Sequence, residues 1–129
     1  MDSFSSLYDA WLVKERRANT ELETELAKSY RGAWDTGNID DRYAILCFIC
    51  DRRDEDGFDL VIEGLGSQDA DLALNAAAIT FSLISEGFSM GLAVREALDH
   101  FAERFPDRDE FRWATLKALD RNETGTQSV

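Results

Sequence analysis

The feature that most restricts the fold of this 129-residue chain is its single proline, Pro106. Proline interrupts helices and sheet interiors, so a chain with one proline can form helices along nearly its whole length. Apolar residues recur at helical spacing between short turns that contain Gly, Asn or Asp. The apolar stretch 43–50 could also form a buried strand, but no other segment offers a partner strand. The sequence therefore predicts an all-α protein.

About seven short helices joined by turns of a few residues are expected, so sequential neighbours should pack antiparallel. Several helix ends carry capping signals: Thr20 with Glu23, Ser67 and Asp69, Ser89, Asp107 with Glu110, and the terminating glycines Gly64, Gly66 and Gly87. The most apolar helix is expected from Asp71 to Ser85 and should be central, because a helix that is apolar on most sides must be surrounded by others. Apolar residues make up 44% of the chain, enough for a folded core. We expect one helical domain at 1–121 and a polar, frayed tail at 122–129.

Charge is distributed unevenly along the chain, which has a net charge of -12. No lysine, arginine or histidine occurs between Arg53 and Arg95. A folded acidic surface attracts basic partners and repels nucleic acid and anionic membranes. This base-free window contains eight acids: Asp54, Glu55, Asp56, Asp59, Glu63, Asp69, Asp71 and Glu86.

The pair Cys47 and Cys50 forms the one formal motif in the chain. A structural zinc site needs four ligands, and the sequence has no second cysteine pair and one histidine, His100. A redox pair normally begins a helix, whereas this pair lies inside an apolar run. Both cysteines are therefore interpreted as small buried hydrophobic residues in a reducing compartment, and no metal is assigned.

The acidic segment 52–63 partly matches the calcium loop of an EF-hand. With Gly57 at the glycine position, Asp54, Asp56 and Glu63 fall on ligand positions. Arg52 then occupies the first ligand position, where the loop needs a carboxylate. An acidic turn is the better interpretation, and no cofactor is expected.

The sequence also gives little indication of a catalytic site. His100 lies four residues after Glu96, which predicts a surface pair rather than a general base. The chain has no phosphate-binding glycine loop, hydrolase nucleophile motif or zinc-protease motif. The protein is therefore not expected to be an enzyme.

The segment from Asp41 to Leu119 resembles the HEAT-like class of helical repeats. The resemblance lies in an apolar first helix, an acidic or glycine turn, an amphipathic second helix and the sequence Ser-Gln-Asp-Ala-Asp before an Ala-rich helix. It implies a HEAT-like α-α superhelix; a compact helical bundle explains the same periodicity. The chain is also similar to bacterial immunity proteins and other small inhibitors of nucleic-acid-processing enzymes, which are commonly small, acidic, helical and without catalytic motifs.

These features predict a non-catalytic module that neutralises a basic, nuclease-like or nucleic-acid-binding protein such as a toxin by occluding its active groove. Neither nucleic acid nor a membrane is expected to bind directly. The alternative is a helical-repeat scaffold that binds a peptide or helix in an apolar groove. The predicted partner-binding acids lie at turns that a solenoid would align along one edge: Asp51, Asp54, Glu55, Asp56, Asp59, Asp69 and Asp71.

Aromatic residues near acids are the other interface candidates. Trp34, beside Asp35 at a helix end, is the predicted anchor, although core packing is the alternative for such residues. Phe111 and Trp113, on either side of Arg112, have the same two interpretations.

The N-terminus lacks the basic start and long apolar stretch of a signal peptide, and no apolar run is long enough to span a membrane. A cytoplasmic location is expected.

Overall fold

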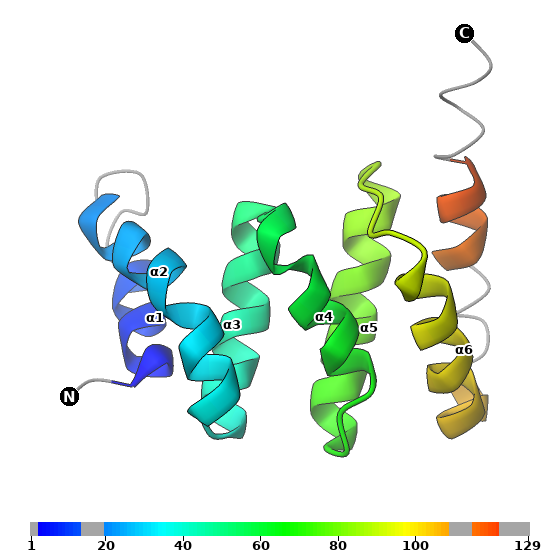
Figure 1. Ribbon diagram of the computed structural model, residues 1–129, viewed down its shortest axis with the longest axis horizontal. Coiled ribbons are helices and arrows are strands. Elements are labelled where there is room, and N and C mark those ends of the chain that lie inside the picture. The colour runs from blue at the N-terminus through cyan, green and yellow to red at the C-terminus, as the bar shows by residue number, and fades with distance from the viewer. Residues whose placement is uncertain (1–2, 14–19, 109–114, 122–129) are drawn as a thin grey trace, which may run out of the picture. The chain divides into compact units, whose positions relative to one another are not determined.

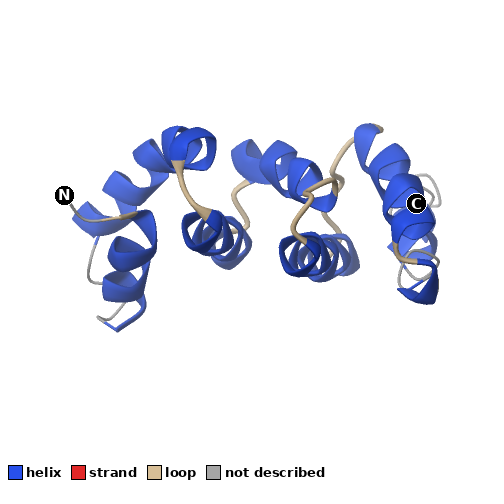
Figure 2. Ribbon diagram, turned by 90° about the horizontal axis from the view of Figure 1, so that it is seen from below, coloured by secondary structure: helices blue, strands red, loops and turns tan. Residues whose placement is uncertain are grey.

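The computed structural model describes residues 3–13, 20–108 and 115–121 (Figure 1). Helices and loops account for these residues, and no strand occurs among them (Figure 2). The all-α prediction is confirmed. Residues 115–121 form a further α-helical segment after six α-helices and two 3-10 helices. In chain order these are α1 (Phe4–Val13), α2 (Thr20–Thr36), α3 (Ile39–Arg52), η1 (Glu55–Gly57), α4 (Phe58–Leu65), α5 (Ala70–Ser85), α6 (Ala93–Arg104) and η2 (Pro106–Arg108).

The chain divides into two compact units, Met1–Phe48 and Ile49–Val129. The division falls within α3, so the last turn of that helix belongs to the second unit. Whether 1–121 behaves as one domain stays a prediction, and the tail 122–129 lies outside the described residues.

The first unit is organised around the fully buried ring of Phe48. Phe4, Tyr8 and Trp11 come from α1 and Tyr30 from α2, and each meets Phe48 edge-on with centroids 5.2–6.3 Å apart. Edge-to-face pairs place the positive edge of one ring against the negative face of another. One phenylalanine therefore holds α1 and α2 against α3.

Asp41 makes a second link within this unit. Its side chain lies in the first turn of α3 and is 8% exposed. The Oδ1 atom accepts a hydrogen bond from the backbone N–H of Ser5 at 3.0 Å, and the Asn38 side chain accepts from the Asp41 N–H at 3.0 Å. A carboxylate at the start of a helix satisfies N–H groups that have no partner within the helix. The Asp41 carboxylate thus caps the start of α1, and the Asn38 side chain caps the start of α3.

In the second unit α4 packs against both α5 and α6. Helix α5 coincides with the predicted central helix and buries Leu72, Ala76 and Leu83 among others. Asp69 caps its start by accepting from the Leu72 N–H at 2.9 Å. Gly87, at φ +104°, follows its end, as the sequence predicted.

Other predicted helix ends have mixed outcomes. Gly66 follows α4 as expected, whereas Gly64, also predicted to end this helix, lies inside it. The expectation that Ser89 caps α6 is wrong: the helix begins at Ala93, and Leu92 precedes it without a side-chain cap. The predicted capping pairs at Thr20 and Asp107 depend on groups outside the described residues.

Candidate functional site

The predicted partner-binding acids divide into two groups in the second unit. We call Asp51, Asp54, Glu55, Asp56 and Asp59 the first acidic corner, because they surround the turn from α3 to α4. The second acidic corner is Asp69 and Asp71, in the turn from α4 to α5 and the first turn of α5.

The two corners lie at opposite ends of α4 (Figure 1). Helix α4 has eight residues, which corresponds to a length of about 12 Å at the rise of an α-helix. The expectation that all these acids line one edge is therefore corrected. Successive turns alternate between the two ends of antiparallel helices. Because a single helix, α4, separates the two corners along the chain, they lie at opposite ends of it.

The backbone of the first acidic corner is set by the way α3 ends. The Arg53 N–H donates to the Cys50 carbonyl at 3.1 Å, and the Asp54 N–H donates to the Ile49 carbonyl at 3.0 Å. This pair of hydrogen bonds is a Schellman motif, which normally has glycine at its left-handed position. Here Arg53 occupies that position with φ 50°. The sequence has no glycine at this position, so the end of α3 could not be predicted from a glycine signal.

Asp54 then starts η1. Its Oδ1 atom accepts from the Asp56 N–H at 3.2 Å, while Oδ2 lies 3.9 Å from the Arg52 guanidinium. Asp54 and Asp51 are half-buried, whereas Glu55, Asp56 and Asp59 are exposed. Asp54 thus has a structural role, and the exposed carboxylates are the ones that a partner could reach.

Arg53 also connects this corner to the end of α5. Its Nη2 atom donates to Glu86 Oε1 at 2.7 Å, and Nη1 donates to the Asp51 carbonyl at 3.2 Å. The hydrogen bond to Glu86, and then its negative charge, raise the pKa of the Arg53 guanidinium above its ordinary value. The base-free window therefore does have a counter-charge, supplied by the arginine directly before it.

An aromatic contact links the start of α4 to the end of α5. Phe58 begins α4, Phe88 follows α5, and their rings meet edge-on at a centroid distance of 5.7 Å. A polar cleft of about 310 Å³ lies at the corner and is lined by Arg52, Arg53, Asp54, Glu55 and Asp56. The surface is acidic on balance, but two guanidinium groups are part of it.

The second acidic corner is covered in part by Arg104 of α6. Its guanidinium donates to the carbonyl oxygens of Ser67 and of Gln68, the latter at 2.7 Å. The Asp69 side chain caps α5, so one of the two acids is engaged in holding a helix start. This corner has less free negative charge than the sequence suggested.

The prediction that Trp34 is an interface anchor is corrected by its burial. Its side chain is 2% exposed in the first unit, and the Arg42 guanidinium lies over the ring at 5.3 Å from the centroid. Arg42 Nε also donates to the Trp34 carbonyl at 3.0 Å. Core packing explains this tryptophan, and it is not an exposed anchor. Phe111 and Trp113 lie outside the described residues.

The cysteines differ from expectation as well. Cys47 and Cys50 are not joined in a disulfide and are half-buried, whereas the sequence predicted buried side chains. Their positions on α3 turn them partly away from the core residues Phe48 and Ile49.

The segment compared with a calcium loop is mostly helical, with η1 and α4 spanning 55–65. Within the described ranges, no group of three or more metal-ligating side chains converges. In the same ranges no helix has the length and apolar character needed to cross a membrane.

Sequence reasoning missed an apolar pocket between α5 and α6, lined by Leu74, Ala77, Ala78, Phe101 and Arg108. The run of alanines in α5 was the available signal, because small side chains leave space beside a helix.

Fold and surface together define an all-α protein with an acidic helix-turn corner held between the ends of α3 and α5. Comparison with known protein families, curated proteins and solved structures found no match to this chain.

Proposed function

We propose that this chain is a non-catalytic protein-binding module that neutralises a basic, nucleic-acid-binding partner. The first acidic corner would contact the partner's basic groove and occlude the surface that holds a nucleic-acid backbone. The HEAT-like arrangement and the immunity-type role are part of this proposal.

One observation carries the proposal: Glu55, Asp56 and Asp59 are exposed on a turn whose backbone is fixed on both sides. The Arg53–Glu86 bond and the Phe58–Phe88 contact hold that turn against the end of α5. Preorganised carboxylates lose little conformational entropy on binding. Complementary charge mainly raises the association rate and selects the partner.

The test is a triple charge reversal that avoids the structural acid Asp54. Glu55, Asp56 and Asp59 are changed to lysine, and the matched control reverses three exposed acids of α2 and α6, namely Glu25, Glu96 and Glu103. Both variants have the same net charge, so the comparison isolates position from overall charge.

Each immobilised variant is exposed to native cell extract, and each captured protein is purified and assayed for nucleic-acid binding. We expect wild type and control to capture a basic protein and to displace a DNA duplex from it. The corner variant should lose both effects, and higher salt should weaken capture by screening. Equal capture by the corner and control variants would disprove the proposed surface.

The scaffold alternative is favoured by one feature, the apolar pocket beside α5. A partner held there would bind with little dependence on salt, because apolar burial is not screened. The same capture at low and high salt therefore separates the two functions.

A further inference from the structure

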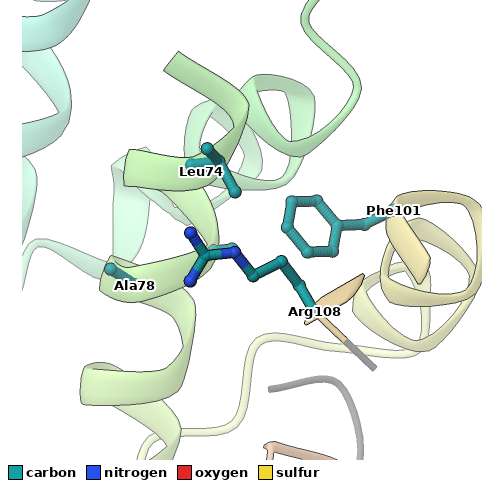
Figure 3. Close-up of a pocket in the computed structure, with 5 residues that line it drawn as sticks. Leu74, Ala78, Phe101 and Arg108 are labelled. Carbon is teal, nitrogen blue, oxygen red and sulfur yellow. The ribbon is translucent and has the colours of Figure 1, made fainter. Parts of the chain in front are cut away.

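The pocket between α5 and α6 has a volume of about 160 Å³ and shares no residue with either acidic corner. Leu74, Ala77 and Ala78 of α5 form one wall, and Phe101 of α6 forms the other (Figure 3). The pocket exists because two consecutive alanines face a phenylalanine ring, and their methyl groups leave unfilled space. Among the residues that the structure describes, its lining is apolar apart from one side chain, Arg108.

Arg108 extends from η2 toward α5, so that its guanidinium lies beside Leu74 and Ala78 with the Phe101 ring facing it (Figure 3). The Arg108 backbone N–H donates to the Phe105 carbonyl at 2.9 Å. Its guanidinium makes no hydrogen bond or ion pair with any residue that the structure describes. A guanidinium is a planar fork of donors that matches a carboxylate in two parallel hydrogen bonds. The pocket therefore combines an apolar wall with an anion-binding group at its edge.

The volume restricts what can enter. Sites for cofactors and drug-sized ligands usually measure roughly 300–1,000 Å³. A dry apolar cavity of about 150 Å³ accommodates benzene. One aromatic ring fits this space, whereas a helix or a nucleotide does not.

We propose that this pocket binds an aromatic ring joined by a short linker to a carboxylate. The ring would lie in the pocket against Phe101, and the carboxylate would accept hydrogen bonds from Arg108. This site is independent of the proposed function at the first acidic corner. Its ligand chemistry can come from a free arylalkanoic acid or from the C-terminal phenylalanine of another chain.

The binding test is an NMR titration of the full 129-residue chain labelled with ¹⁵N. The ligand 3-phenylpropionate is added to about 10 mM, because a ligand this small is expected to bind weakly. We expect amide shifts at Leu74, Ala78 and Phe101. The uncharged isostere 3-phenylpropanamide should bind about tenfold more weakly, because it lacks the charge-assisted bond. No shift at these amides, or equal binding of acid and amide, would overturn the proposal.

Two variants test the assigned residues. Arg108→Gln should weaken 3-phenylpropionate binding about tenfold while leaving the amide's affinity unchanged. Arg52→Gln removes the same charge at the first acidic corner and should have no effect. Ala78→Leu, at an exposed position that tolerates a larger side chain, should fill the pocket and abolish binding of both compounds. Unchanged binding in Arg108→Gln or in Ala78→Leu contradicts the site.

The two sources are separated with the peptide acetyl-Ala-Ala-Phe, compared with its C-terminal amide. A free-acid peptide that binds at least about tenfold more tightly than 3-phenylpropionate, a gain of about 1.4 kcal/mol, identifies a chain end as the ligand. Tighter binding of the small acid identifies a free metabolite of that class.

Discussion

The guanidinium of Arg53 donates to the carboxylate of Glu86 at 2.7 Å, joining the C-terminal ends of α3 and α5. Both helices end with the same pattern of backbone hydrogen bonds. The N–H groups of Gly87 and Phe88 donate to the carbonyls of Ile84 and Leu83, and those of Arg53 and Asp54 donate to the carbonyls of Cys50 and Ile49. Glu86 and Arg53 are also exposed. The bond therefore positions the first acidic corner more than it stabilises the protein.

Glu86→Gln should lower the melting temperature slightly at low salt and have no effect at about 1 M salt, where the screening length falls to about 3 Å. The change should also increase amide hydrogen exchange at residues 53–57. A matched loss of charge at exposed Glu103, as Glu103→Gln, should leave exchange in that turn unchanged. Identical exchange profiles for the two variants would show that the bond does not hold the corner.

Gly32→Ala should stabilise the protein by about 0.5–1 kcal/mol, because glycine in a helix interior is less favourable than alanine. Gly32 lies in α2, and a Cβ atom there would have no neighbour within 4 Å. Gly37→Ala is the contrasting variant, since its Cβ would clash with the Ala33 carbonyl oxygen and approach the Asp41 side chain. Urea unfolding of both variants should give opposite signs; a loss of stability in Gly32→Ala would contradict the packing described.

Asp69→Ala should destabilise the protein by about 1 kcal/mol through loss of the α5 cap. Asp71→Ala removes the same charge two residues later, from a side chain without the capping bond, and should cost less. The measurement is the free energy of unfolding in urea at matched ionic strength. Equal losses would mean that charge near the helix start, not the cap, stabilises α5.

Asp41→Ala should destabilise the protein by about 1–3 kcal/mol, because it leaves the half-buried Ser5 N–H without its acceptor. Asp41→Asn keeps an acceptor oxygen and should lose less. The control is Asp40→Ala, at the neighbouring exposed acid, which should change the free energy of unfolding very little. An Asp41 variant as stable as the Asp40 variant would contradict the link between α1 and α3.

Phe48→Ala should destabilise the protein by about 3–5 kcal/mol, since it removes a ring that four other aromatic side chains contact. Trp11 fluorescence reports the loss, because that ring packs directly on Phe48. Phe48→Leu is the milder variant if the alanine variant does not fold. Phe81→Ala, at a partly exposed phenylalanine of α5, should cost less than either.

Much of the helical framework was predictable from local pattern. The most apolar helix was expected from Asp71 to Ser85 and is observed from Ala70 to Ser85, with Asp69 as its cap and Gly87 after its end. These signals act over one or two turns, so they are present in the sequence. The end of α3 was less visible, because Arg53 adopts the left-handed conformation that glycine usually signals.

The partner-binding residues were only partly predictable. Charge along the chain revealed the two acidic corners, but not that Arg53 binds Glu86 beside the first corner or that Arg104 donates to the Gln68 backbone carbonyl at the second. Trp34 looked like an anchor beside an acidic turn, and the structure buries it under Arg42.

Helical period, caps and charge are local properties, so the all-α class, the apolar helix α5 and the position of the acids along the chain follow from the sequence alone. Which acids lie together depends on how the helices pack. Antiparallel helices bring the ends of α3 and α5 to one corner and carry Asp69 and Asp71 to the far end of α4. The same packing sets Ala77 and Ala78 opposite Phe101, a pairing that residues more than twenty positions apart acquire only when the chain is folded.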